Sequence, residues 1–184
     1  LVLGVDKPSQ SPRGRAERMT GINHLADDAI VPFTHFALLA DQYAQRWGVN
    51  PDDVARVAVK NHGNGALNPN AHRQQVRTLE EILGGRPVAG NFTTLQCTPV
   101  GEGAAAVIIA SEDAIRRLNI SSDKPVRVTG SASRSQRVYD DNSNFDANLT
   151  SETTEICLRE AGLKPEQLDV VELHDAFTVE EVQY

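Results

Sequence analysis

Residues 104–110 read Ala-Ala-Ala-Val-Ile-Ile-Ala, a continuous apolar run, and Ser111-Glu112-Asp113 follow it directly. Such a run is typical of a strand buried on both faces of a sheet. The polar triplet predicts a helix N-terminus, with the helix extending to about Leu118. Two further strands are predicted at Val126–Thr129 and Asp169–Leu173. Strand, helix and strand in this order predict a βαβ unit, a parallel sheet and an α/β fold.

Helices are predicted on both sides of this unit. Apolar residues between Phe33 and Trp47 recur at the spacing of one helix face. Asn50-Pro51-Asp52-Asp53 predicts the start of a helix that ends near His62, where Gly63-Asn64-Gly65 follows. A short helix is expected from Thr78 to Leu83, and a longer one from Thr150 or Ser151 to Gly162.

Composition limits the class of protein. The chain has 184 residues, room for one domain or two small ones, and a net charge of −7. This acidic balance argues against bulk nucleic-acid binding, and no apolar window is long enough for a membrane-spanning helix. Two cysteines, Cys97 and Cys157, cannot form a disulfide framework, so we expect a reduced intracellular protein.

Both ends of the sequence read like the interior of a fold. The chain opens on a strand-like run, Leu1–Val5, and closes on a helical pattern with no stop signal, Val179–Tyr184. We therefore expect these residues to be part of a longer protein.

His174 is the first candidate for chemistry, because it follows a predicted buried strand and opens the next helix. In parallel sheets, ligands bind outside the carboxyl ends of the strands. An imidazole there can donate a hydrogen bond to a developing oxyanion or transfer a proton. The alternative is a structural histidine bonded to a carbonyl or to Asp175. The segment Gly130-Ser131-Ala132-Ser133 leaves the same predicted edge and opens a long polar loop.

Other polar segments each allow two interpretations. Lys60 to Pro69, which includes Asn61 and His62, is either a pocket loop or a helix end followed by a turn. Cys97 is either a nucleophile or a small buried residue. Arg13, Arg15 and Arg18 either bind a phosphate or form a solvated basic loop. His62 and His72 fit no metal-ligand spacing, so no metal site is expected.

Several motifs occur together in one order. Val170 to Thr178 resembles the His-Asp-Ala-Phe motif of sterol-carrier-protein-type thiolases and related lipid-transfer thiolases. Val59 to Pro69 resembles that family's Lys-Asn-His…Asn-Pro segment, and Gly103 to Val107 its Gly-Ala-Ala-Ala strand. Ala161 to Asp169 resembles the helix end before the first motif, and Leu3 to Lys7 the strand after the nucleophile helix. The resemblance covers essentially the whole chain.

The resemblance implies a thiolase fold of two α/β/α halves with mostly parallel sheets, only partly covered by this chain. Residues 1–120 would be the latter part of the N-terminal half with its helical loop region, and residues 121–184 the start of the C-terminal half. His174 would help to form the oxyanion hole for a thioester carbonyl. Gly130 and Ser131, Arg13 and Arg15, and Asn61 and His62 would bind the substrate.

The resemblance also implies acyl-CoA chemistry, with coenzyme A as co-substrate and no other cofactor. The complete enzyme would cleave a 3-ketoacyl-CoA or catalyse the reverse condensation, as a homodimer or higher oligomer, with a small partner subunit as a further option. A steroid-CoA retro-aldolase and a non-catalytic acyl-CoA- or lipid-binding subunit are the alternatives. The family's nucleophilic cysteine precedes the position of Leu1, so we expect this chain by itself to be inactive. The expected location is the cytoplasm, or the peroxisome in a eukaryote.

Overall fold

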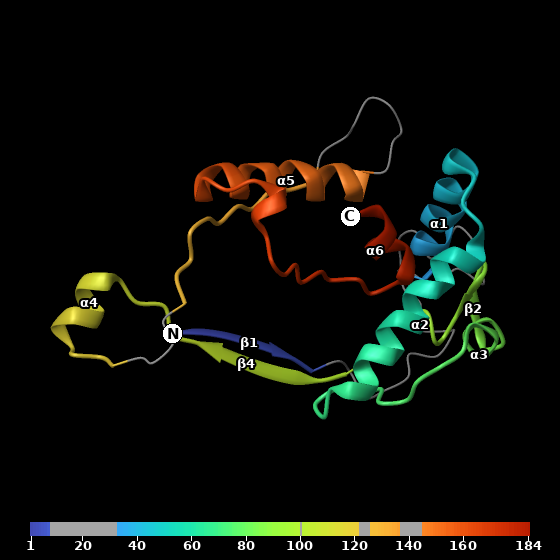
Figure 1. Ribbon diagram of the computed structural model, residues 1–184, viewed down its shortest axis with the longest axis horizontal. Helices are drawn as coiled ribbons and strands as arrows, with labels where there is room; N and C mark the ends of the chain where they lie inside the picture. Colours follow the sequence, from blue (N-terminus) through green and yellow to red (C-terminus); the bar gives the residue numbers. More distant parts are fainter. Residues whose placement is uncertain (8–32, 100, 122–125, 137–144) are drawn as a thin grey trace, which may run out of the picture.

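A computed structural model describes residues 1–7, 33–99, 101–121, 126–136 and 145–184 (Figure 1). The helices are α1 (Phe33–Trp47), α2 (Pro51–Leu67), α3 (Leu79–Leu83), α4 (Glu112–Arg117), α5 (Phe145–Ala161) and α6 (Thr178–Gln183), with a 3₁₀ turn η3 at Pro165–Gln167. The strands are β1 (Val2–Asp6), β2 (Pro87–Ala89), β3 (Phe92–Thr93) and β4 (Gly103–Val107). None of the helices in the described residues is long and apolar enough to cross a membrane.

Local signals set the starts of most helices. The side chain of Asn50 accepts a hydrogen bond from the backbone N–H of Asp52 at 3.0 Å, which caps α2 as predicted. The predicted end of α2 near His62 is wrong, because the helix continues to Leu67. The glycine at position 65 serves a different purpose from a helix cap, because a Cβ there would lie 2.7 Å from the carbonyl oxygen of Arg73. Gly65 thus permits the following loop to return closely along the helix.

α5 begins at Phe145, earlier than the predicted cap at Thr150 or Ser151. Hydroxyl residues favour caps, but they also fit inside a helix when the hydroxyl finds a partner there. The Thr153 hydroxyl donates to the carbonyl oxygen of Leu149 at 2.7 Å, one turn back. The predicted start of this helix at Thr150 or Ser151 is therefore wrong, because these hydroxyl residues lie inside α5.

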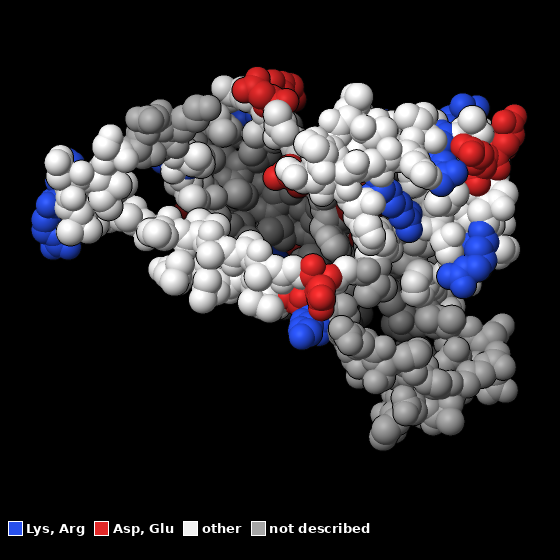
Figure 2. Space-filling model, turned by 90° about the horizontal axis from the view of Figure 1, so that it is seen from below, with Lys and Arg blue, Asp and Glu red and all other residues white. Residues whose placement is uncertain are grey.

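Both sheets of the described residues have two strands, and both are antiparallel. β1 pairs with β4, with Gly4 opposite Ala105, and β2 pairs with β3. The β1–β4 ribbon extends away from the helical cluster toward α4 (Figure 1). All residues of β1 and β4 are exposed. On the face in Figure 2, uncharged surface covers most of this ribbon, and acidic and basic side chains are interspersed over the other described residues.

The predicted parallel βαβ pairing does not form within the described residues. Residues 126–129 and 169–173 have no strand partner there, and Val126 and Val170 are 92% and 80% exposed. The physical reason is that an apolar run predicts burial, whereas a strand also needs a neighbour to satisfy its backbone groups. β4 has such a neighbour in β1, on one edge, and both of its faces are exposed among the described residues.

The core lies among α1, α2, α3, α6 and the β2–β3 hairpin, on the right in Figure 1. Phe177 is its centre and contacts aromatic rings from two other elements. Its ring centroid lies 4.4 Å from that of Phe36 in a stacked arrangement and 5.5 Å from that of Phe33 edge-on. A second cluster is formed by Ala55, Ala58 and Ile82 between α2 and α3. The phenylalanine of the His-Asp-Ala-Phe motif is therefore part of the core, whereas the histidine is exposed.

Candidate functional site

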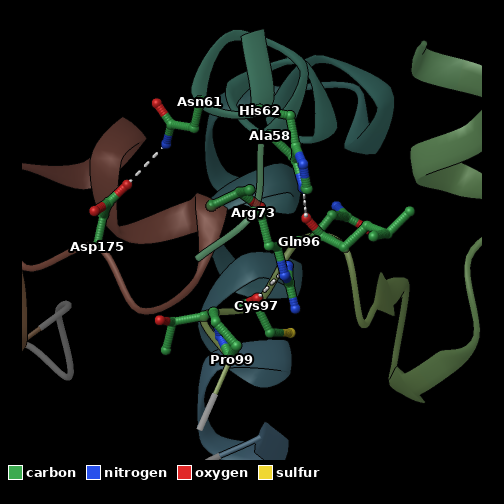
Figure 3. A pocket seen from close by; sticks show the side chains of 11 residues that line it. Ala58, Asn61, His62, Arg73, Gln96, Cys97, Pro99 and Asp175 are labelled. Atoms are coloured by element: carbon green, nitrogen blue, oxygen red, sulfur yellow. Dashed lines mark hydrogen bonds between the residues drawn. The ribbon is translucent and has the colours of Figure 1, made fainter. Parts of the chain in front are cut away.

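A cavity of about 190 Å³ lies where α2, residues 95–99 and residues 175–178 meet (Figure 3). Its polar lining comes from α2, from the loop after it and from the motif segment. The lining residues are Ala58, Asn61, His62, Arg73, Leu95, Gln96, Cys97, Thr98, Pro99, Asp175 and Thr178. A wider depression of about 400 Å³ adjoins it and shares His62, Arg73 and Leu95. Together the two hollows reach the size typical of small-molecule sites, about 300–1,000 Å³.

Two segments about eighty residues apart in sequence form one wall of the cavity. The backbone N–H of Thr98 donates to the carbonyl oxygen of Ala176 at 2.8 Å, and that of Thr178 donates to the carbonyl oxygen of Gln96 at 3.2 Å. Cys97 and Phe177 lie opposite each other in an antiparallel bridge. Burial of Phe177 in the core therefore fixes the motif segment against residues 96–98.

Arg73 holds the loop that leads to this wall. Its Nη1 donates to the carbonyl oxygen of Cys97 and its Nη2 to that of Thr94, each at 3.0 Å. The Cys97 thiol is buried and donates to the carbonyl oxygen of Thr93 at 3.3 Å. Burial raises the pKa of Cys97 to about 11 although Arg73 acts in the opposite direction. Cys97 is thus a neutral buried thiol near pH 7, which confirms the structural interpretation over the nucleophilic one.

His62 has one ring nitrogen without a partner. Its Nε2 lies 3.2 Å from the carbonyl oxygen of Leu95, which can only accept, so Nε2 is the donor of this contact. The side chain is only 7% exposed. Within the described part of the chain, His62 Nδ1 and Thr178 Oγ1 are buried without a hydrogen-bond partner. Because buried polar groups normally find partners, these two atoms suit a bound polar group.

A charged cluster borders the cavity. Nδ2 of Asn61 donates to Oδ2 of Asp175 at 3.0 Å and to Oε2 of Glu181 at 3.1 Å, and Lys60 forms an ion pair with Glu181. Burial, together with the charge of Glu181, raises the pKa of Asp175. Burial also acts to raise the pKa of Glu181, but its hydrogen bonds and the charge of Lys60 outweigh burial and lower that pKa.

The structure separates the predicted site residues. Asn61 and His62 line the cavity, whereas His174 is exposed just outside it and is not part of its lining. Gly130 and Ser131 pack against α5, where the Ser131 backbone N–H donates to a carboxylate oxygen of Glu160 at 3.1 Å. Arg13 and Arg15 lie outside the described residues. No group of three or more potential metal ligands occurs in the described ranges.

The sequence is similar to three kinds of known protein, and no protein-family model matches it. It is 36% identical to sterol carrier protein 2 of Gallus gallus over 162 residues, which cover 85% of this chain and 29% of that protein. It is 35% identical over 150 residues to the benzoylsuccinyl-CoA thiolase subunit BbsB of Thauera aromatica, which cover 81% of this chain and 38% of that subunit. It is 31% identical over 146 residues to an acetyl-CoA acetyltransferase of Methanothermobacter thermautotrophicus, covering 78% of this chain and 37% of that enzyme.

The chain is thus homologous to thiolases and to sterol carrier protein 2 over about four fifths of its length. This confirms the family predicted from the ordered motifs, and with it the α/β class. The chain spans about three tenths to two fifths of the length of these relatives.

The sequence analysis assigned no site role to three residues of the cavity. Arg73, Thr178 and Asp175 enter it through contacts between segments that are distant along the chain. Asp175 belongs to the His-Asp-Ala-Phe motif, and this position could have indicated that it lies at the site. The sequence analysis named Asp175 only as a hydrogen-bond partner of His174. Arg73 follows the Asn68-Pro69 turn without any distinctive pattern.

Proposed function

We propose that the complete protein is an acyl-CoA thiolase-type acyltransferase of lipid or sterol side-chain metabolism. It would cleave a 3-ketoacyl-CoA with coenzyme A or catalyse the reverse condensation. The observation that carries the proposal is the fixed position of the His-Asp-Ala-Phe segment beside a polar cavity. Two of the relatives bear names that specify CoA thioesters, benzoylsuccinyl-CoA and acetyl-CoA.

His174 is the proposed catalytic residue. Its side chain is exposed while the next residue, Asp175, is held at the cavity rim. An imidazole N–H in this place can donate to a thioester carbonyl oxygen as negative charge develops on it. Cys97 is not the proposed nucleophile, because a buried thiol with a pKa of about 11 supplies very little thiolate near pH 7. The nucleophile would come from a residue outside this chain.

Coenzyme A is the proposed co-substrate, and no resident cofactor or metal is part of the proposal. Its polar groups would contact polar residues that line the cavity, among them His62, Arg73 and Thr178. A homodimer, or a complex with a small partner subunit, and a cytoplasmic or peroxisomal location complete the proposal.

The test uses the complete protein and follows thiolysis of 3-ketoacyl-CoA substrates by chromatography of the acyl-CoA products. His174→Ala is expected to lower kcat by about 10²–10³, the usual effect of losing one oxyanion-hole donor. Glu172→Ala is the matched control, because it removes an exposed side chain from the same segment. An unchanged kcat in His174→Ala would remove His174 from the mechanism.

A non-catalytic subunit or a retro-aldolase is the second candidate, favoured by the word "subunit" in the name of one relative and "carrier" in that of another. The amount of free CoA thiol consumed during the reaction distinguishes the three functions. Thiolysis consumes one CoA thiol for each substrate cleaved, whereas retro-aldol cleavage of a steroid side-chain CoA ester consumes none. Tight acyl-CoA binding without turnover would support the binding subunit.

A further inference from the structure

We infer that Asn61 is a positioning residue, whose side-chain amide ties α2 to Asp175 and so fixes the backbone that presents His174. This inference rests on the proposed function of His174 and adds a second residue to it. It also changes the role expected for Asn61, which the sequence had suggested as a substrate ligand.

The geometry uses the whole donor capacity of the amide. A primary amide nitrogen carries two hydrogens, and Nδ2 of Asn61 directs one to Asp175 and one to Glu181, at 3.0 and 3.1 Å. Figure 3 shows the Asn61 side chain reaching from its helix toward Asp175. With both hydrogens used, Nδ2 has none left to donate to a ligand. An aspartate in this position would have no hydrogen to donate when ionised.

The electrostatics explain why a donor is needed here. The carboxylates of Asp175 and Glu181 converge on one amide nitrogen, and Lys60 is paired with Glu181. Two partly buried carboxylates this close repel each other, as the raised pKa of Asp175 indicates. Without the amide, the least costly response is for Asp175 to turn outward into water, and its backbone would move with it.

His174 is positioned by the contacts of the residues that follow it, and Asp175 is the nearest of these. Residues 176–178 are held by the backbone hydrogen bonds to residues 96–98, and Asp175 is held by Asn61. Residues 170–173, on the other side of His174, are exposed and unpaired within the described residues. The position of His174 is thus set from its C-terminal side, and a displacement of about 1 Å at a reacting group costs up to about 10²-fold in rate.

The kinetic test compares Asn61→Ala with Asn64→Ala in the complete protein. Asn64 is an exposed asparagine on the same helix, so the second variant is a matched control. Asn61→Ala is expected to lower kcat by about 10- to 100-fold while KM changes less than about twofold. In a His174→Ala background the same change should cost less than about twofold, because its effect passes through His174. Equal losses in both backgrounds would overturn the inference.

A second measurement needs no turnover. Hydrogen exchange at the backbone N–H groups of Thr98 and Thr178 reports whether the motif segment stays docked. Exchange is expected to quicken in Asn61→Ala by about tenfold or more and to stay unchanged in Asn64→Ala. If exchange quickens but the wild type shows no thiolysis, the proposed function fails while the anchor stands. If exchange does not change, the anchor itself is refuted.

A conservative variant guards against general damage to the fold. Asn61→Gln keeps both amide hydrogens on a longer side chain, so it should recover at least part of the kcat lost in Asn61→Ala. A Gln variant that folds normally yet is as slow as the Ala variant would contradict the role of the amide donors.

Discussion

Replacement of Phe177 tests how the motif segment is held in the core. The side chain is 3% exposed, and its ring contacts those of Phe36 at 4.4 Å, Phe33 at 5.5 Å and Phe92 at 5.7 Å. Phe177→Ala removes this volume and should cost about 3–5 kcal/mol of unfolding free energy. Phe177→Leu keeps most of the volume but loses three aromatic pairs, each worth about 0.5–1.5 kcal/mol and not fully additive. We expect it to cost about 2 kcal/mol.

The assay is urea unfolding followed by the fluorescence of Trp47, the single tryptophan and the last residue of α1. The control is Val170→Ala, because Val170 is 80% exposed and its truncation should change the unfolding free energy by no more than about 0.5 kcal/mol. A loss in Phe177→Ala as small as that of the control would refute the reasoning. Equal losses in the Leu and Ala variants would show that volume contributes little beyond the aromatic pairs.

Three further predictions concern the site and its supporting helix. Iodoacetamide at about pH 8 should modify half-buried Cys157 at least about tenfold faster than Cys97, and the reaction of Cys97 should become faster as pH approaches its pKa of about 11. Peptide mass spectrometry measures both rates, and equal rates would argue against burial of Cys97. In α2, Gly63→Ala should stabilise the protein by about 0.5–1 kcal/mol, since nothing lies within 4 Å of the new Cβ. Gly65→Ala should destabilise it by about 1–3 kcal/mol, because its Cβ would meet a backbone carbonyl oxygen at 2.7 Å. Thermal unfolding measures both changes, and the same sign for both would contradict the close approach at Gly65. Folding raises the pKa of Asp175 above its ordinary 3.8. The stability that this group contributes is therefore present below pH 3.8 and is lost as pH rises through the pKa of the folded state. Asp175→Asn should gain stability relative to wild type between about pH 3.5 and 7 in urea titrations, and the opposite trend would contradict the raised pKa.

The helices could be predicted because their signals are local. Thr78 and Glu81 form the reciprocal capping hydrogen bonds of α3, and the Ser111 side chain caps α4, both within four residues of sequence. Gly48, with φ of +64°, follows the last residue of α1, where a glycine commonly ends a helix. The strand partners could not be predicted in the same way. The run after Gly103 is apolar in either kind of sheet, and its antiparallel register with Val2 to Asp6 depends on residues about a hundred positions away.

The candidate site was predictable to the extent that it lies within motifs. Asn61 and His62 belong to a recognisable segment, and the structure places both at the cavity. The role of Asn61 could not be read from that segment, because its two acceptors, Asp175 and Glu181, come from the far end of the chain. Arg73 gave no signal, since its partners are backbone carbonyl oxygens, which every sequence contains.

The bridge between Cys97 and Phe177 also has a consequence for synthesis of the protein. About eighty residues separate the two positions. At translation rates of about 5–20 residues per second, Phe92 of β3 is made roughly 4–17 seconds before Phe177, and Phe33 of α1 roughly 7–29 seconds before it. During that interval the nascent chain presents an unfinished apolar surface at the ribosome, and chaperones that bind such surfaces would have time to act before the cavity exists.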